Sequence, residues 1–253
     1  KGRHNYFPKW AIRKESLEYF REVLARRSMR VKLRDVHDLP PMIKKLVPVE
    51  MSPEQAKIYR SMEKDLFAKD EESGKEALAP TILSRTLRLQ QILCGYLEDQ
   101  SIKSTRLEAL RQVVESIKDE QFIIWTIFSL TYRDISRLLD QLGISYGLLT
   151  GKESLDQKEE AKAAFQAEKL QGLIAHPRAG GIGVNLTAAR YAITYARGYS
   201  LKDNEQKLAR NERPGCEHHE TLIQIDLCCP GTVDEDSLLA IEHKKKAVDF
   251  IFD

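Results

Sequence analysis

The chain has 253 residues, of which 42% are hydrophobic and 31% are charged, and its formal net charge is +2. This length and composition fit one large or two small folded domains and exclude an intrinsically disordered chain. The low net charge excludes a bulk positive field, so any nucleic-acid contact has to come from local patches. The longest mostly apolar run, FIIWTIF at 122–128, is far too short to span a bilayer. Without a signal-peptide pattern and with a start at Lys1, we expect a fragment of a longer protein that has no membrane partner.

The cysteines point to a reducing compartment. There are four of them: Cys94, Cys216, Cys228 and Cys229. Their spacing fits no disulfide scaffold, so we expect a cytoplasmic location, or a nuclear one in a eukaryote. Cys216, His218 and His219 are metal-binding residue types, but no second ligand pair follows at a standard separation. The sequence therefore predicts no metal site.

The first hundred residues are dominated by helical patterns. Ser52, Pro53 and Gln55 form a good helix start, with Ser52 as the cap and Gln55 completing a capping box. We expect this helix to reach about residue 69, after a strand at 43–51, and a second helix at 80–97. The polar stretch 98–104 then separates two styles of sequence. We expect a helical lead-in and linker region over residues 1–100 and a second domain over residues 101–253.

After that break, short apolar strands alternate with amphipathic helices. We expect strands at 121–128, 144–150, 171–177, 190–196 and 221–229. We expect helices at 104–118, 131–143, 154–166, 200–213 and from 232 to the end of the chain. Such alternation predicts an α/β fold, a three-layer αβα sandwich around a mostly parallel sheet. Function in such sheets collects in the loops beyond the carboxyl ends of the strands.

The stretch GLLTGKES at 147–154 resembles a phosphate-binding P-loop but does not match it. Only three residues separate the glycines where four are needed, and Glu153 stands where a hydroxyl would meet magnesium. An Asp-Glu pair closing an apolar strand is missing as well, because Asp226 has no second acid beside it. The sequence therefore predicts no self-contained triphosphate site.

A cluster of three glycines, Gly180, Gly181 and Gly183, follows the predicted strand at 171–177. Glycines allow close backbone approach and leave amide groups free to meet an anion. The plain alternative is a flexible turn, but Asn185-Leu186-Thr187 at a fixed offset makes the pattern more specific.

A second pattern lies on the predicted helix 200–213. Gln206, Arg210 and Arg213 would occupy one narrow stripe of that helix. The plain alternative is a solvated charged face. The helix, however, begins at the functional edge of the sheet, and an arginine fork suits phosphate oxygens. Such a pair is typical of arginine fingers in phosphoryl transfer.

Together these patterns resemble the second, C-terminal RecA-like motor lobe of the superfamily-two helicases, in particular the Swi/Snf-like DNA translocases. One family motif matches AGGIGVNLTAA at 179–189 throughout. The other, a glutamine followed by arginines four and seven positions later and then by Gly and Gln, matches 206–216 except for Cys216. Ala209 and Ser200 also depart from the usual pattern. Weaker likenesses fall in the right order at 39–41, 47–59, 89–93, 104–110 and 231–245.

The resemblance implies a division of labour between two lobes. A first lobe, absent from this sequence, would hold ATP and Mg²⁺, and Arg210 and Arg213 would reach the γ-phosphate. Gln206, Gly181 and Gly183 would contact the nucleotide. Residues of two loops would contact double-stranded DNA: Thr150, Gly151, Arg178, Gly180 and Asn185. Contacts would go mostly to phosphates, so sequence preference should be weak and salt dependence strong.

Alternatives remain open at this point. We expect the chain alone to be catalytically inert, since it lacks the P-loop lobe. A non-catalytic module that holds DNA or a protein on the same fold is the second reading. An RNA helicase lobe is the third, and such lobes tend to carry a denser arginine run. The basic stretch 26–34 could bind DNA or the missing lobe, or could be a solvated connector.

Overall fold

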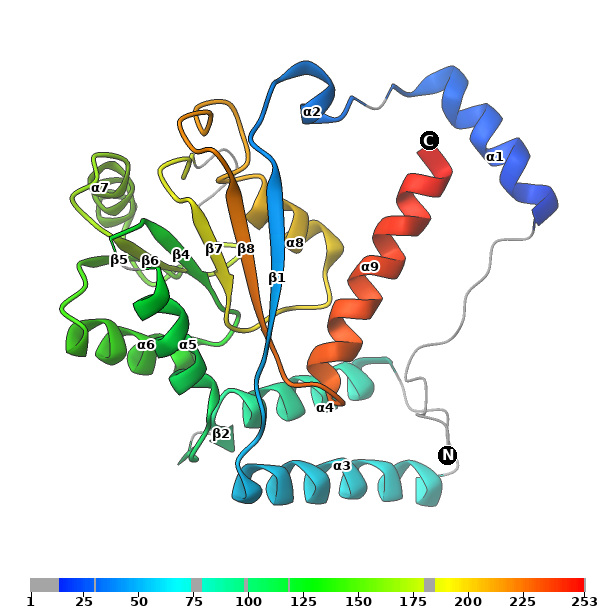
Figure 1. Cartoon of the computed structure of the whole chain (residues 1–253). Coiled ribbons are helices and arrows are strands. Elements are labelled where there is room, and N and C mark those ends of the chain that lie inside the picture. Colours follow the sequence, from blue (N-terminus) through cyan, green and yellow to red (C-terminus); the bar gives the residue numbers. More distant parts are fainter. Residues whose placement is uncertain are drawn as a thin grey trace.

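A six-stranded parallel sheet organises the molecule (Figure 1). The computed structural model describes residues 14–29, 31–73, 79–97, 100–117, 119–179 and 185–252. The strands lie in the order β1 (Met42–Pro48), β8 (Leu222–Cys228), β7 (Tyr191–Thr194), β4 (Phe122–Trp125), β6 (Gly172–Ala175) and β5 (Tyr146–Leu149). Every neighbouring pair in this sheet is parallel, as the alternation of strands and helices predicts.

Strand β4 shows why helices cover both faces. Its side chains alternate between two apolar clusters, with Phe122 and Ile124 in one and Ile123 and Trp125 in the other. All four are completely buried. A strand buried on both faces reads as a continuous apolar run, which is what FIIW provides. The three-layer αβα arrangement is confirmed.

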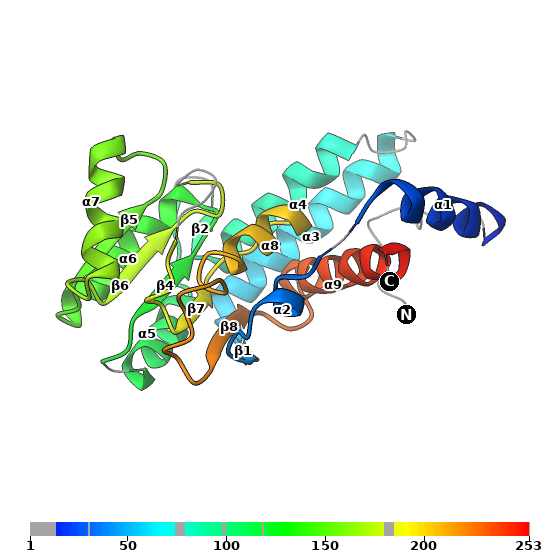
Figure 2. The same cartoon turned by 90° about the horizontal axis from the view of Figure 1, so that it is seen from above.

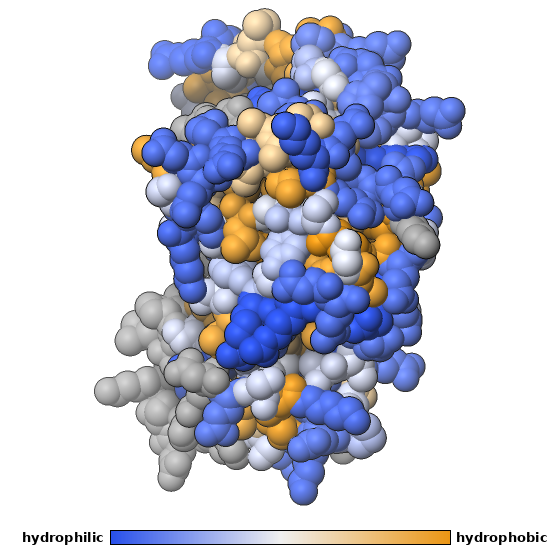
Figure 3. Space-filling model, turned by 90° about the vertical axis from the view of Figure 1, so that its left-hand side faces the viewer, coloured by the Kyte–Doolittle hydropathy of each residue, from blue (hydrophilic) through white to orange (hydrophobic). Residues whose placement is uncertain are grey.

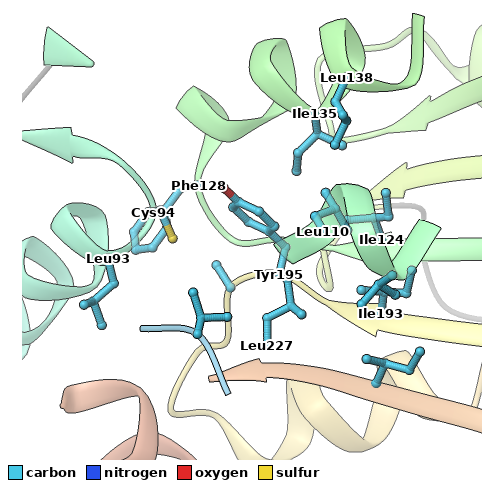
Figure 4. Packing of buried hydrophobic residues seen from close by; sticks show 14 of the residues in the cluster. Leu93, Cys94, Leu110, Ile124, Phe128, Ile135, Leu138, Ile193, Tyr195 and Leu227 are labelled. Atoms are coloured by element: carbon cyan, nitrogen blue, oxygen red, sulfur yellow. The ribbon is translucent and has the colours of Figure 1, made fainter. Parts of the chain in front are cut away.

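The larger cluster lies between the sheet and two helices, α5 (Arg106–Ser116) and α6 (Ser129–Gln141). Figure 4 shows Leu110 from α5 and Ile135 and Leu138 from α6 near Ile124 and Ile193 of the sheet. The opposite face is covered by α7 (Leu155–Gln166), whose Phe165 packs with Trp125, and by α8 (Leu201–Leu208). The last helix, α9 (Val233–Phe252), packs against α8.

Two elements from the first hundred residues also join this core. Strand β1 pairs with β8 and so forms one edge of the sheet. Helices α3 (Pro53–Ser73) and α4 (Ala79–Leu93) lie side by side (Figure 2), and Tyr59 and Ile92 belong to the larger apolar cluster. A short antiparallel hairpin, β2 (Tyr96–Leu97) and β3 (Gln100–Ser101), follows α4. The domain boundary near residue 100 stays a prediction, although packing runs across it.

Helix caps follow the sequence closely at α7 and only partly at α3. Ser154 accepts from Gln157 N and the Gln157 side chain accepts from Ser154 N, so the capping box is complete. Ser52 accepts from the Gln55 amide as expected, but the Gln55 side chain donates to the carbonyl of Ile92 at 2.8 Å. Tertiary contact with α4 has replaced the second half of that capping box.

Two N-terminal helices were not predicted, α1 (Lys14–Arg27) and α2 (Leu33–Val36). They contain much of the basic stretch. Arg34 on α2 forms an ion pair with Glu212, with 2.6 Å between Nη2 and Oε1, and Arg26 pairs with Glu22. These two arginines are therefore bound to carboxylates of the chain itself. No helix among the described residues combines the length and apolar character needed to cross a membrane.

Candidate functional site at the carboxyl edge of the sheet

The strands end at one common edge because all of them are parallel. The turn after β5 carries Thr150 and Gly151, and the loop after β6 carries Arg178. The segment after α8 carries Arg210, which reaches the loop after β6, and Arg213. Arg213 lies toward the amino ends of β1 and β8 instead, since its neighbours Glu212 and Cys216 contact Arg34 and Leu222. Gly180, Gly181 and Gly183 lie outside the described residues, so their predicted roles stay predictions.

The stripe of three residues on one helix is a wrong prediction. Helix α8 ends at Leu208, and Ala209 forms its C-cap, so only Gln206 of the three lies on the helix. Arg210 and Arg213 follow in turns that lead to Gly215, whose φ is +104°. Beyond the helix the Arg210 carbonyl accepts from Leu186 N at 2.9 Å, and Pro214 has no N–H that could have continued the helical ladder to that carbonyl. Sequence periodicity cannot show this tertiary hydrogen bond.

Arg210 is buried and held by two backbone carbonyls. Its Nη1 donates to Ala179 O at 2.9 Å and its Nη2 donates to Pro177 O at 2.8 Å. The guanidinium carbon also lies 5.3 Å from the centroid of the Trp125 ring, within cation–π range. Burial lowers the pKa of Arg210 from its usual value. The arginine therefore connects the segment after α8 to the loop after β6.

Arg213 and Gln206 have different surroundings. Arg213 is half-buried, and its carbonyl accepts from Cys216 N at 3.1 Å. Gln206 is exposed on α8. Cys216 is completely buried and packs with Leu39 and Leu222. The residue that replaces the family's glutamine is thus a packing residue.

Asn185 and its neighbours tie the glycine motif to the arginine motif. The Asn185 side chain is exposed, and its Oδ1 accepts from Thr187 N at 3.3 Å. Leu186 donates its amide to the Arg210 carbonyl, and Arg210 holds Pro177 and Ala179 on the other side of the glycines. The two most specific motifs of the sequence therefore meet at Arg210.

Arg178 points away from the core. Its Nε donates to Asp203 Oδ2 at 2.7 Å, and 72% of the Arg178 side chain is exposed. Its backbone amide donates to Nδ1 of His176 at 3.0 Å. Burial, together with the nearby charge of Arg178, lowers the pKa of His176. No role was predicted for His176, whose only signal in the sequence was its position near the end of the predicted strand at 171–177.

The turn after β5 holds a carboxylate. The Glu153 side chain accepts from Thr150 N at 2.8 Å, from Gly151 N at 3.0 Å and from Thr150 Oγ1 at 2.7 Å. Partial burial alone would raise the pKa of Glu153, but these hydrogen bonds outweigh it and lower the pKa below its usual range. The backbone amides of Thr150 and Gly151, which are predicted to bind a DNA phosphate, thus already bind the Glu153 carboxylate.

A buried charge cluster beneath α8 was missed by sequence reasoning. Lys207 donates to Thr194 Oγ1 at 2.8 Å, and Arg197 Nη2 lies 2.5 Å from Asp226 Oδ1. Burial, and then the charge of Arg197, lower the pKa of Lys207 to about 7, despite Asp226. The only signal in the sequence was the unpaired acid in the apolar strand at 221–229.

The described residues contain no cluster suited to a metal. Among them, no group of three or more His, Cys, Asp and Glu side chains could hold an ion. The rings of His218 and His219 lie with centroids 3.9 Å apart, and His219 Nε2 lies 2.9 Å from the carbonyl of Thr187.

Comparison with known proteins agrees with this geometry. Residues 105–215 match the family described as the helicase conserved C-terminal domain. The Bacillus subtilis protein YwqA, whose name describes an ATP-dependent helicase/translocase, is 28% identical over 227 residues, covering 85% of this chain and 24% of that protein. Of three curated relatives, the chain spans between 12% and 24% of the length.

Two solved structures have a similar fold. The C-terminal part of the Fun30 ATPase domain matches with a TM-score of 0.65 at 15% identity, over 85% of this chain and 98% of that chain. The Sulfolobus solfataricus SWI2/SNF2 ATPase core in complex with dsDNA matches with a TM-score of 0.64 at 23% identity, over 90% of this chain and 50% of that chain. At these identities the likeness establishes the fold.

Proposed function

Because the chain carries the C-terminal RecA-like lobe of a Swi/Snf-type superfamily-two helicase, we propose that it is the second motor lobe of an ATP-dependent double-stranded DNA translocase. One observation carries the proposal. Arg210 connects the two motifs through hydrogen bonds to Pro177 and Ala179 on one side and from Leu186 on the other. A change at the arginines would thereby reach the loop expected to contact DNA.

In this proposal the guanidinium groups of Arg213 and Arg210 bind the γ-phosphate of ATP. The first lobe supplies most of the contacts to that ATP and to Mg²⁺. Arg213, half-buried beyond the end of α8, is the more accessible of the two. Arg210 would have to exchange two carbonyl partners for phosphate oxygens. Gln206, Gly181 and Gly183 complete the proposed nucleotide contacts.

The proposed DNA contacts come from two segments, the turn after β5 and the segment between β6 and β7. Thr150 and Gly151 offer backbone amides, Arg178 an exposed guanidinium and Asn185 an exposed amide, with Gly180 between the last two in sequence. These groups suit phosphate oxygens rather than base edges. Binding should therefore weaken steeply with salt and depend little on sequence.

The test compares ATP hydrolysis by this chain and by a longer form that restores the first lobe, each with and without duplex DNA. We expect no ATP hydrolysis by the chain alone, and ATP hydrolysis by the longer form that increases when DNA is added. Arg213→Ala should lower the stimulated rate by about 10³-fold or more, the usual size for an arginine finger. Arg137→Ala, on the exposed face of α6, is the matched control. Hydrolysis by the chain alone would overturn the two-lobe division.

One observation favours a second candidate, a binding module without catalysis. Both Nη atoms of Arg210 are already bonded within the chain, and the side chain is buried. If Arg210 only holds these two carbonyls, its role is structural and it does not contact ATP. If the longer form binds duplex DNA but hydrolyses no ATP, the binding module is the correct reading.

A further inference from the structure

We propose that Glu153 is an internal competitor for the DNA phosphate, an acid that occupies the donor set of Thr150 and Gly151 and must leave when DNA binds there. This inference rests on the proposed function, because it concerns the DNA contact assigned to the turn after β5. It adds a residue that sets the affinity of that contact and that the sequence showed only as a departure from the P-loop pattern at 147–154.

The donors of Thr150 and Gly151, which we call the cradle, surround the Glu153 carboxylate as an anion-binding site surrounds its anion. One carboxylate oxygen of Glu153 accepts from two successive amides, Thr150 N and Gly151 N, while the other accepts from the Thr150 hydroxyl. Converging amides of this kind bind phosphate as readily as carboxylate. Gly151 adopts a φ of +99°, which glycine accepts readily, and the chain turns there between the two amides and Glu153.

Two anions cannot share these donors. Two like charges at contact distance near a protein surface repel each other strongly. The carboxylate is held in its charged form, since its hydrogen bonds lower the pKa of Glu153. A DNA phosphate therefore gains the amides only if the Glu153 side chain swings out.

Glu153 is not needed to cap the helix that follows. The α7 N-terminus is capped by Ser154, which accepts from Gln157 N, and Gln157 reciprocates to Ser154 N. Both hydrogen bonds form without Glu153. Removing its carboxylate therefore empties the cradle while leaving the helix cap in place.

The surroundings favour access by a polar partner. Glu153 is half-buried, and Gly151, Lys152 and Ser154 around it are exposed. Hydrophilic side chains cover most of the face that carries β5 and α7, with smaller apolar patches between them (Figure 3). From α6, Tyr132 lies within electrostatic reach, and burial together with the Glu153 charge raises the pKa of Tyr132 to about 12, so it stays neutral.

The test measures the affinity of the chain for a fluorescent 30-base-pair duplex by anisotropy over a series of KCl concentrations. For Glu153→Ala we expect binding about tenfold tighter than for the natural chain. We also expect the slope of log K against log[salt] to steepen by about 0.9, the value for one added phosphate contact. Glu153→Gln, which keeps the shape but not the charge, should lie between the two and serves if the alanine variant folds poorly.

Asp156→Asn is the matched control. Asp156 is an exposed acid in the first turn of α7, so its loss changes the net charge equally but leaves the cradle filled. We expect a smaller gain in affinity and an unchanged salt slope. A second readout is the amide NMR shifts of Thr150 and Gly151, which should move on adding duplex to Glu153→Ala.

Two negative results are distinguishable. If the chain binds duplex but Glu153→Ala gains no more than Asp156→Asn, with the same slope and unmoved amides, Glu153 does not compete. If neither the chain nor any variant binds duplex at low salt, the proposed DNA contact itself is wrong, and the inference falls with it.

Discussion

Two loops at the carboxyl edge of the sheet each bind a charged side chain through their backbone, and the two charges have opposite signs. After β5, the amides of Thr150 and Gly151 donate to the Glu153 carboxylate. After β6, the carbonyls of Pro177 and Ala179 accept from Arg210. The acid is half-buried and comes from its own turn, whereas the arginine is buried and comes from a distant segment. The first contact can be released locally, but the second holds two parts of the lobe together.

The largest effect should come from breaking the buried contact. Arg210→Met keeps the apolar stem over Trp125 but removes both donors, leaving two buried carbonyls without partners. Each unsatisfied buried group costs about 1–3 kcal/mol, so we expect the free energy of unfolding to fall by about 2–4 kcal/mol. Urea denaturation of the isolated chain measures it.

Arg213→Met is the control for that substitution, since it changes a half-buried guanidinium three residues away. We expect a loss of about 1 kcal/mol or less. Equal losses for the two variants would show that Arg210 does not hold the loops together, and the contrast between the loops would disappear.

A smaller effect concerns the other buried cation of this segment, Lys207. Its pKa is lowered to about 7 in the folded chain from an unfolded value near 10.5. Between these values the unfolded chain binds more protons, so stability rises with pH from about 7 toward 10.5 and is lowest below 7. We expect a slope of about 1 kcal/mol per pH unit over pH 7–9, and urea midpoints across that range measure it.

Lys207→Met should remove that slope and be more stable than the natural chain at pH 6. Lys207 borders a cavity of about 260 Å³, so the methionine has room. Lys202→Met, at an exposed position of α8, is the control and should keep the slope. Identical pH profiles for all three chains would mean that burial does not neutralise Lys207.

The smallest effect separates the cap of α7 from the neighbouring cradle. Ser154→Ala removes the N-cap and should cost about 1 kcal/mol of stability. It leaves all three hydrogen bonds of Glu153 intact, so duplex affinity should not change. A rise in affinity like that expected for Glu153→Ala would show that cap and cradle act as one unit.

Much of the fold could be predicted because local patterns and tertiary packing agree. The run FIIW has to be a strand buried on both faces, and Ser154 with Gln157 has to begin a helix. The αβα layers follow from that alternation. The two motifs likewise marked the segments that meet where Leu186 N donates to the Arg210 carbonyl.

Several of the missed features depend on contacts between segments distant in sequence. The Arg210 carbonyl accepts from Leu186 N beyond the end of α8, and Gln55 leaves its capping box for the end of α4. The Arg197–Asp226 pair joins the segment after β7 to strand β8, two parts of the chain that are separate in sequence.

By itself, then, the sequence determined which segments become strands and helices, and which residues form the two motifs. The periodicity of apolar residues and the chemistry of caps are local, so they can be read along the chain. Only the tertiary structure decided that Arg210 faces the carbonyls of Pro177 and Ala179, which belong to a distant segment. The contact of Glu153 with its amides forms within one turn, but which backbone carbonyls lie within reach of Arg210 is set by the packing of the whole lobe.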